Sequence, residues 1–245
     1  MDQRVALVTG GTGGIGEAVC QRFVQDGYKV VAAYNNEEKA KKWQIVQKEA
    51  GFDIEIVHCP VTDFEACGVA IKWVEDNVGP IDILVNNAGI TQDGMFKKMP
   101  IERWDAVIGT NLNSLFNMTR QVFEGMVERG FGRIVNVSSV NGQLGQVGQV
   151  NYSAAKAGMH GFTKALARET AHKGVTVNTI SPGYVATPMV MAIAEDVRHK
   201  IENGIPVGRL CQPEEIAHGI SFLASELAAY TTGSDLSMNG GLFMH

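Results

Sequence analysis

The sequence of 245 residues lacks any apolar run long enough to cross a membrane. A membrane-spanning helix needs ~20 mostly apolar residues in succession, and no segment here approaches that length. The first residues, Met1-Asp-Gln-Arg, lead at once into a strand-like segment and lack the apolar stretch of a secretory signal peptide. We therefore predict a soluble, cytoplasmic protein with no membrane as a partner.

Long basic runs are missing as well. The chain has 26 acidic and 21 basic side chains, which gives a formal net charge of −5. Proteins that bind nucleic acids usually concentrate lysine and arginine on one face to neutralise phosphates. This balance argues against nucleic acid as the main partner.

Cysteine is scarce, and its spacing carries no motif. The four cysteines include no C-x-x-C pair and have no histidine at metal-ligand spacing; they are Cys20, Cys59, Cys67 and Cys211. We expect reduced, buried thiols of a cytosolic protein and no metal site.

Linkers, repeats and low-complexity segments are also absent, so we predict a single domain over residues 1–245. Short apolar segments alternate with helical patterns, and most of them lack a period of two, which is typical of a parallel sheet covered on both faces. The predicted strands are residues 5–9, 29–33, 54–57, 81–85, 133–137, 175–180 and 235–238. The predicted helices are residues 15–26, 37–50, 63–77, 101–129, 188–203 and 213–225, together with a helix that carries Tyr152 and runs to about residue 172. A TIM barrel is the competing α/β architecture.

A glycine-rich segment, Thr-Gly-Gly-Thr-Gly-Gly-Ile-Gly at residues 9–16, connects the first strand to the first helix. Glycines at this point allow a tight turn and bring the free N–H groups of a helix terminus close to a pyrophosphate. The glycines fit two registers, Gly11-x-Gly13-x-x-Gly16 and Gly10-x-x-x-Gly14-x-Gly16. The segment favours a Rossmann-like doubly wound sheet, although a tight connection without any ligand remains an alternative. Its candidate cofactor contacts are Gly10, Thr12, Gly13, Gly14, Ile15 and Gly16.

The end of the second strand bears on which nicotinamide cofactor would bind. An NAD site usually places an acidic residue there, on the ribose 2′-hydroxyl, but this strand ends in Ala-Tyr34-Asn-Asn. The missing acid and the nearby Lys39 favour the 2′-phosphate of NADPH. NADH remains an alternative, because Glu37 and Glu38 follow one step later. We select Tyr34 and Lys39 as cofactor contacts.

Two further turns fall at the same edge of the predicted sheet. The first, Asn86-Asn-Ala-Gly89, closes the fourth strand, where its amides would line a ribose, hold backbone groups in a turn, or do both. The second follows the sixth strand and would shape the wall at the nicotinamide. The candidate contacts from the two turns are Asn87, Ala88, Gly89, Pro182, Gly183, Val185 and Thr187.

The chemistry is concentrated in residues 138–156. Tyr152 and Lys156 are four residues apart in a predicted helix and so share one face, about one turn apart. A Gly/Gln-rich loop before this helix can bring Ser139 over the same face. A hydroxyl, a phenol and an ammonium that meet at one point suit proton transfer to a carbonyl oxygen.

Taken together, these segments resemble the short-chain dehydrogenase/reductase family in sequence and order, from the glycine segment through Asn111 to Tyr152-x-x-x-Lys156. The resemblance implies a sheet of about seven parallel strands and hydride transfer from a nicotinamide cofactor. It also implies a role for each residue: Tyr152 as the general acid, Ser139 on the carbonyl oxygen, and Asn111 holding a water. Lys156 would bind the nicotinamide ribose together with Tyr152 and would lower the pKa of the phenol.

Within this family the chain most resembles reductases of 3-oxoacyl thioesters, in residues 86–99, 132–166 and 238–245. This similarity implies an acyl-CoA substrate, NADPH and a homotetramer. Around the substrate it points to Asp93, Gln146, Gln149 and Tyr184. It also suggests that the Met-rich segment within residues 188–205 is a lid over the acyl chain, although such a segment is more often a stripe facing the core.

Three alternatives remain open. The first is a thioester of acyl carrier protein, which would need a basic surface beside the cleft, with Arg129 and Lys173 as candidates. The second is a nucleotide-sensing binding protein that has lost the chemistry. The third is a dehydrogenase of bare alcohols or ketones on the same scaffold.

Overall fold

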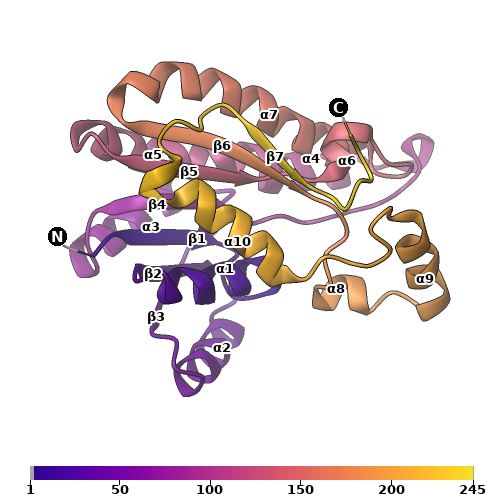
Figure 1. Ribbon diagram of the computed structural model, residues 1–245, viewed down its shortest axis with the longest axis horizontal. Coiled ribbons are helices and arrows are strands. Elements are labelled where there is room, and N and C mark those ends of the chain that lie inside the picture. Colours follow the sequence, from indigo (N-terminus) through magenta and orange to yellow (C-terminus); the bar gives the residue numbers. More distant parts are fainter. Residues whose placement is uncertain (1–2, 245) are drawn as a thin grey trace.

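The structure, a computed structural model, describes residues 3–244, and its centre is one sheet of seven parallel strands (Figure 1). The strands lie side by side in the order β3-β2-β1-β4-β5-β6-β7. Their bounds are β1 Val5–Thr9, β2 Lys29–Tyr34, β3 Ile54–His58, β4 Ile81–Asn86, β5 Gly132–Val137, β6 Val175–Pro182 and β7 Asp235–Met238. The open parallel sheet confirms the predicted doubly wound fold and rules out the TIM barrel.

Helices cover both faces of the sheet (Figure 1). One face packs against α1 and α10, and the other against α3, α5 and α7. The longer helices are α1 Gly14–Gln25, α2 Glu37–Glu49, α3 Phe64–Asn77, α4 Ile101–Ile108, α5 Ser114–Glu128, α7 Val150–Thr170, α9 Glu195–Gly204 and α10 Pro213–Ala224. Two short helices are α6 Val140–Leu144 and α8 Pro188–Met191. No helix within residues 3–244 is long and apolar enough to cross a membrane.

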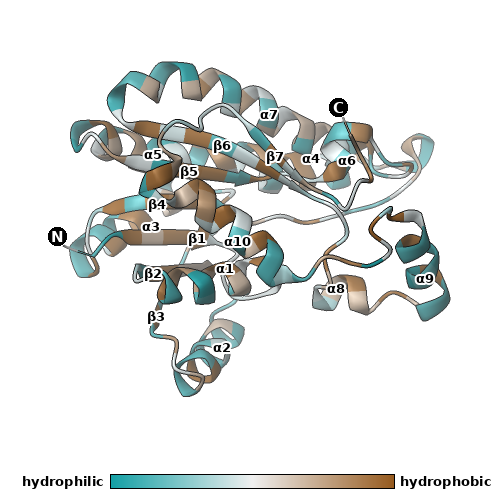
Figure 2. Cartoon of the chain, in the orientation of Figure 1, coloured by the Kyte–Doolittle hydropathy of each residue, from teal (hydrophilic) through white to brown (hydrophobic). Residues whose placement is uncertain are grey.

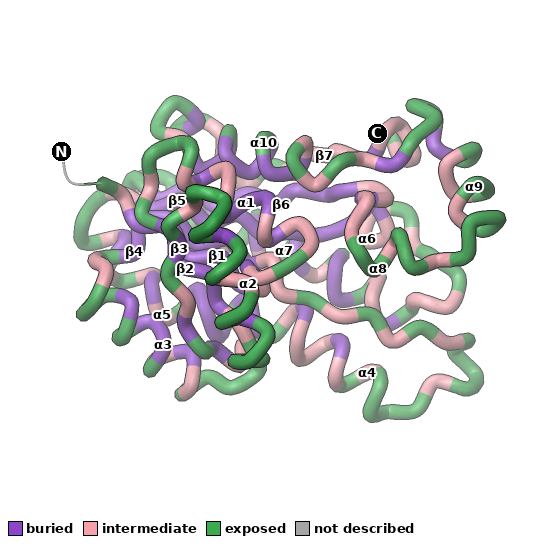
Figure 3. The backbone as a smooth tube through the Cα atoms, turned by 90° about the horizontal axis from the view of Figure 1, so that it is seen from below, coloured by how far each residue is buried: buried purple, intermediate pink, exposed green. Residues whose placement is uncertain are grey.

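Two hydrophobic cores explain why the strands are apolar without a period of two. Along β1, the side chains of Val5 and Leu7 enter the core with α3 and α5, whereas Ala6 and Val8 enter the core with α1 and α10. Because successive residues of a strand point to opposite faces, a strand buried on both faces must be apolar throughout. Figure 2 shows this concentration of apolar residues in the strands, and Figure 3 shows the same strands buried.

Two predicted helices are interrupted. The region predicted as one helix over residues 101–129 consists of α4 and α5 joined by a π-helical turn, Gly109–Asn113. The segment at 188–203 is divided into α8 and α9. By contrast, the helix predicted over residues 63–77 is continuous in α3, and Asp63 caps its start: the carboxylate accepts a hydrogen bond from the N–H of Ala66 at 2.9 Å.

The strand order places the candidate site. The chain leaves β1 toward β2 on one side and later returns to β4 on the other, so β1 and β4 flank the point where the order reverses. In open α/β sheets, ligands bind at the carboxyl ends of the strands beside this point. The glycine segment follows β1 at this edge, and Asn87 follows β4 there.

Candidate active site

A cleft of about 380 Å³ opens at the carboxyl edge of the sheet, between the loops that follow β4, β5 and β6. Of the candidate residues from the sequence, it brings together Ile15, Asn87, Gly89, Asp93, Ser139, Gln149, Tyr152, Lys156, Pro182, Gly183, Tyr184, Val185 and Thr187. The exposed side chain of Gln146 does not line it. The remaining candidates, Gly10, Thr12, Gly13, Gly14, Gly16, Tyr34, Lys39, Ala88 and Asn111, lie outside its wall.

The first turns of α7 carry the phenol and the ammonium. Tyr152 and Lys156 share one face of this helix, and Lys156 Nζ lies 5.6 Å from the centroid of the tyrosine ring. The lysine is 3% exposed, and its Nζ donates a 2.7 Å hydrogen bond to the carbonyl of Val137 at the end of β5. The ammonium group is therefore held at the carboxyl end of β5.

Ser139 reaches the same space from the other side. It is the N-cap of α6, where its Oγ accepts a 3.1 Å hydrogen bond from the N–H of Asn141. It also acts on the phenol of Tyr152 through a hydrogen bond that favours the ionised form. The structure thus brings together the three groups predicted to act on a carbonyl.

Burial shifts the pKa values of both titratable groups. It raises the pKa of the Tyr152 phenol above its usual range, and Asp93 raises it further, whereas Ser139 opposes the shift. Burial also lowers the pKa of Lys156 to about 7, so only part of its population is charged near neutral pH. The lowering of the tyrosine pKa by Lys156 stays a prediction.

Asn111 lies in the π-helical turn between α4 and α5 and is fully buried. Its side chain clamps the backbone of Ile90: Oδ1 accepts from the N–H at 2.8 Å, and Nδ2 donates to the C=O at 2.9 Å. A Cβ added at Gly89 would lie 3.3 Å from Asn111 Oδ1 and 3.6 Å from Lys156 Nζ. Asn111 thus lies next to the ammonium group, but its side chain is engaged with the loop.

The glycine segment meets α1 in a conformation that selects one of the two registers. Gly10 and Gly14 have positive φ values of 61° and 54°, which favour glycine. A Cβ on Gly16 would clash with the carbonyl oxygen of Gly10 and approach Asn87 Nδ2 to 2.8 Å. The register Gly10-x-x-x-Gly14-x-Gly16 therefore needs glycine at all three positions. In the other register Gly11 is required, since its Cβ would lie 2.8 Å from Ala32 Cβ, but Gly13 is not.

Gly13 differs from its neighbours, because a Cβ added there would have no atom within 4 Å. This glycine immediately precedes α1, whose first N–H groups have no partner within the helix. Open space beside a helix N-terminus fits the pyrophosphate of a dinucleotide. The residues present therefore fit a nicotinamide dinucleotide at this edge.

Asn87 joins the segment after β4 to the end of β1. Its Nδ2 donates to the carbonyls of Thr9 and Gly10 at 3.0 and 3.2 Å, while the N–H groups of Asn87 and Ala88 both donate to Thr9 Oγ1 at 3.0 Å. The structural role considered for this turn is thus present. Gly89, which lines the cleft, takes no part in these bonds and stays available to a ligand.

The loop after β6 closes the opposite wall. A Cβ on Gly183 would approach Asn239 Cα to 2.9 Å, so only glycine permits this contact with the carboxyl-terminal segment. Farther along, Thr187 Cγ2 lies 3.4 Å from the position of a Cβ on Gly14. The loop therefore reaches across to the glycine segment, where it was predicted to meet a cofactor.

Two of the predicted substrate contacts bond to each other. Gln149 Nε2 donates to Asp93 Oδ2 at 2.9 Å, and Gln149 Oε1 accepts from Asn141 Nδ2 at 2.9 Å. Sequence reasoning missed Asn141, which also lines the cleft, whereas Val190 and Ile193 line it from the segment predicted to be a lid. The letter of Asn141 gives no signal, because an asparagine fits a loop or a helix face equally well.

Comparison with known proteins agrees with this geometry. A model of the family described as short chain dehydrogenase matches residues 4–198. The acetoacetyl-CoA reductase of Allochromatium vinosum is 58% identical over 244 residues, which cover 99% of each chain. That of Cupriavidus necator is 57% identical over 245 residues and the full length of both chains.

A 3-oxoacyl-[acyl-carrier-protein] reductase of Vibrio harveyi is 43% identical over 244 residues, 100% of this chain and 99% of that one. The match to the family model, the full-length relatives and the dinucleotide-binding edge agree with one another. The chain belongs to the short-chain dehydrogenase family, whose members are oxidoreductases that use NAD or NADP.

Proposed function

We propose that this chain reduces acetoacetyl-CoA to (R)-3-hydroxybutanoyl-CoA with NADPH and so supplies monomers for polyhydroxyalkanoate synthesis. The carrying observation is that Ser139, Tyr152 and Lys156 converge in one cleft of a chain that is 57–58% identical, over its full length, to two acetoacetyl-CoA reductases.

Tyr152 would be the general acid in this reaction. The bound nicotinamide supplies a hydride to the carbonyl carbon, and the carbonyl oxygen then needs a proton. A phenol whose pKa is raised by burial keeps its proton at neutral pH, which is the form that an acid must have. The hydroxyl of Ser139 would hydrogen-bond the same oxygen and orient it toward the phenol.

Lys156 would bind the ribose beside Gly89 and help to return a proton to Tyr152. Burial lowers the pKa of Lys156 to about 7, so a nearby anion or hydrogen-bond acceptor would raise the pKa again and restore the full charge of the ammonium group. Asn111 would support the relay by fixing the loop at Ile90, since both polar ends of its side chain are engaged there. A water in the proton relay would therefore contact the backbone of Asn111 rather than its side chain.

The ion pairs of the two glutamates that follow β2 support the choice of NADPH over NADH. Glu37 pairs with Lys41 and Glu38 with Lys42, each at 2.6 Å and one helical turn apart. Among residues 3–244, no carboxylate pairs with Lys39, which leaves its ammonium group for a 2′-phosphate. Asn36 is itself engaged as the N-cap of α2, where it accepts from the N–H of Lys39.

The alternative substrate, a thioester of acyl carrier protein, loses its candidate docking residues. Arg129 donates a 2.6 Å hydrogen bond to the carbonyl of Ile81, where β4 begins. Lys173 lies two residues before β6 begins at Val175. Both therefore lie at the amino edge of the sheet, opposite the cleft, and cannot form a basic surface beside it.

The segment within 188–205 would be a lid within a single-domain chain. Met189, Val190 and Ile193 line the cleft, while the side chains of Met189 and Met191 are 66% and 47% exposed. Exposed methionines beside a cavity do not form a stripe that faces the core. They suit an adaptable cover over an acyl chain. We also expect a homotetramer, which sedimentation velocity would test.

Initial rates with two substrates and two cofactors test the proposed function. Acetoacetyl-CoA and the acetoacetyl thioester of acyl carrier protein would each be offered with NADPH and with NADH. We expect the highest kcat/KM for acetoacetyl-CoA with NADPH, and an R product on chiral chromatography. A clear preference for the carrier-protein thioester would contradict the proposal.

Tyr152→Phe supplies the mechanistic control. Phenylalanine keeps the ring and removes only the hydroxyl, so turnover should fall by about a thousandfold while NADPH binding stays close to that of the wild type. Titration of NADPH fluorescence would measure the binding. Wild-type turnover in this variant would remove Tyr152 from the reaction.

A further inference from the structure

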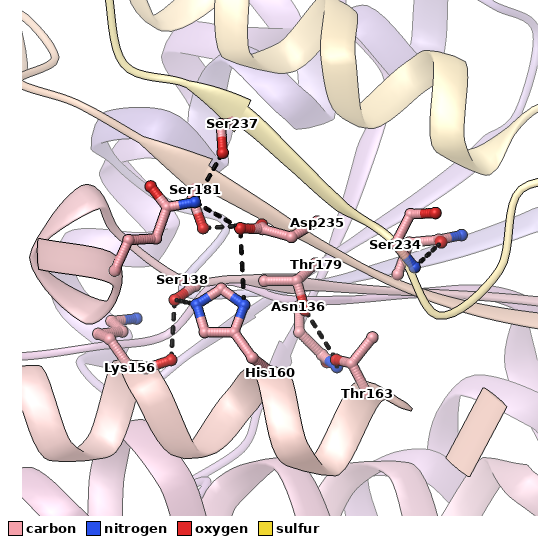
Figure 4. Close-up of polar contacts among 12 residues, drawn as sticks. Asn136, Ser138, Lys156, His160, Thr163, Thr179, Ser181, Ser234, Asp235 and Ser237 are labelled. Atoms are coloured by element: carbon pink, nitrogen blue, oxygen red, sulfur yellow. Dashed lines mark hydrogen bonds and ion pairs between the residues drawn. The ribbon is translucent and has the colours of Figure 1, made fainter. Parts of the chain in front are cut away.

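A second polar cluster lies directly behind the catalytic face and contains three side chains that the reaction does not use (Figure 4). It consists of Ser138 after β5, His160 on α7 and Asp235 on β7. His160 Nε2 lies 3.2 Å from Ser138 Oγ, and His160 Nδ1 lies 3.6 Å from Asp235 Oδ2. The carboxylate is fixed in turn, because Oδ1 accepts from Ser181 Oγ at 2.8 Å and Oδ2 from Gln143 Nε2 at 2.6 Å.

The cluster touches the catalytic residues through the backbone. Ser138 Oγ donates a 2.9 Å hydrogen bond to the carbonyl of Lys156, and Ser138 is the immediate neighbour of Ser139. The N–H of Ser138 is bonded to the carbonyl of Ile180 on β6 at 2.8 Å. One hydroxyl therefore joins the turn that carries Ser139 to the helix that carries Lys156.

Close packing leaves little tolerance at this junction. A Cβ added at Gly142 in α6 would lie 2.8 Å from the carbonyl carbon of Lys156 and 2.9 Å from its Cβ. The short helix after Ser139 therefore rests directly on the lysine. A shift of Ser138 would move Ser139 relative to Tyr152, and misplacing reacting groups by about 1 Å can cost a factor of ~100 in rate.

The hydrogen-bond donors assign a role to the histidine. The single hydroxyl proton of Ser138 is used on the carbonyl of Lys156, so Ser138 Oγ is left as an acceptor toward His160. A proton on His160 Nε2 satisfies that acceptor and fixes the rotation of the hydroxyl. With the proton on Nε2, Nδ1 carries a lone pair toward the Asp235 carboxylate 3.6 Å away, so the orientation of the ring rests on the bond between Nε2 and Ser138.

We propose that His160 is a positioning residue that fixes the Ser138 hydroxyl on the carbonyl of Lys156 and so sets the distance between Ser139 and the Tyr152–Lys156 face. The inference rests on the proposed function, since it assumes that Ser139, Tyr152 and Lys156 carry out the reduction. His160 does not line the cleft, so it acts only through Ser138.

A neighbouring cluster provides a matched control. Three residues farther along α7, Thr163 accepts hydrogen bonds from Asn136 Nδ2 at 2.9 Å and from Thr179 Oγ1 at 2.8 Å (Figure 4). Thr163 is 1% exposed, and its bonds fasten the same helix to β5 and β6 without reaching Ser138 or Lys156. Its loss should affect stability but not chemistry.

The test compares His160→Asn, His160→Gln and Thr163→Val in the full chain. A glutamine amide nitrogen can take the place of Nε2 and still donate to Ser138, whereas asparagine is too short and retains only the Nδ1 side. We expect kcat of His160→Asn to fall about tenfold with NADPH affinity within twofold of the wild type, and His160→Gln to recover most of kcat. Thr163→Val should lower Tm at least as much as His160→Asn does, while its kcat stays within twofold of the wild type.

Three results would overturn the inference: wild-type kcat in His160→Asn, an equal loss of kcat in His160→Gln, or an equal loss in Thr163→Val. If His160→Asn does not fold, Ser138→Ala removes the hydroxyl through which His160 would act and should lower kcat about tenfold at unchanged NADPH affinity; wild-type kcat there would also overturn the inference. Tyr152→Phe, measured in parallel, separates the two ideas. Wild-type turnover in that variant defeats the proposed function, whereas a lost turnover combined with an active His160→Asn defeats only the role of His160.

Discussion

The two halves of the candidate site, the glycine segment and the cleft beside it, are built by different means. Around β1 and α1, the surface is backbone: Gly10 and Gly14 adopt positive φ values, Gly16 packs against the carbonyl of Gly10, and Gly13 opens onto empty space. Around β5 and α7, the surface is side chain: Ser139, Tyr152 and Lys156 project their polar groups into the cleft. The half around β1 and α1, the glycine half, depends on the absence of side chains. The half around β5 and α7, the α7 half, depends on particular polar side chains.

This difference predicts two kinetic signatures. Added bulk in the glycine half should weaken cofactor binding and raise KM, because it removes space or alters the backbone. Deleted polar atoms in the α7 half should lower kcat, because they act on the transition state. Variants that mix the two signatures would show that the halves are coupled.

Lys156→Met should have the largest effect on kcat in the α7 half and should at the same time stabilise the fold. Methionine fills the same volume, but it neither binds the ribose nor carries charge, so we expect turnover to fall by at least about a thousandfold. The burial that lowers the pKa of Lys156 to about 7 is a cost to the folded state, since the unfolded lysine has a pKa near 10.4. Removing it should raise the free energy of unfolding by about 1–3 kcal/mol at pH 7, after the loss of the Val137 hydrogen bond.

The low pKa of Lys156 also determines how the stability difference between Lys156→Met and the wild type changes with pH. Between pH ~7 and ~10 the unfolded wild-type chain binds more protons at this site than the folded chain, so its contribution to wild-type stability rises with pH. The advantage of Lys156→Met should therefore be greatest at or below pH 7 and fade toward pH 10. Urea denaturation at several pH values would measure it, and an advantage that grew with pH would contradict the low lysine pKa.

Gly16→Ala should damage the glycine half through the backbone. The new Cβ would collide with the carbonyl oxygen of Gly10 and with Asn87 Nδ2, neither of which can move without displacing β1 or β4. We expect a loss of about 1–3 kcal/mol in the free energy of unfolding and NADPH affinity reduced more than tenfold. Thermal unfolding and NADPH titration would measure both; wild-type values in the two would show that the segment yields easily.

The sequence was sufficient for the sheet, because strands buried on both faces must be apolar throughout and the glycines identify the first turn. It was also sufficient to group Ser139, Tyr152 and Lys156, since helical spacing and family order both restrict them. The interruption of residues 101–129 was missed, because a π-helical turn needs no proline or glycine pattern different from that of an α-helix.

The protonation states and the polar cluster were beyond a sequence argument. The lowered pKa of Lys156 depends on desolvation by residues from several elements, which spacing does not reveal. His160 and Asp235 are 75 positions apart in the sequence and meet only because α7 and β7 lie over one another (160 to 235). Such pairs become visible only when the topology is known.

Gly13→Ala sharpens the comparison within the glycine half, with a smaller effect than Gly16→Ala. Its φ of 178° is extended backbone that alanine adopts, and no atom lies within 4 Å of the added Cβ. The free energy of unfolding should stay within about 0.5 kcal/mol of the wild type. If the open space belongs to the pyrophosphate, NADPH affinity should fall about tenfold; unchanged affinity would place the pyrophosphate elsewhere.

Lys39→Ala should have the smallest effect and should separate the two cofactors. Lys39 has no carboxylate partner among residues 3–244, so its removal costs no ion pair, whereas a 2′-phosphate would lose one charge-assisted contact of about 1 kcal/mol. We expect KM for NADPH to rise about fivefold and KM for NADH to stay unchanged. Lys42→Ala is the matched control, because that lysine is bound to Glu38 at 2.6 Å. Equal effects of the two variants, or an equal change in KM for both cofactors, would mean that the lysine acts only through the general positive charge of α2 and does not bind the 2′-phosphate directly.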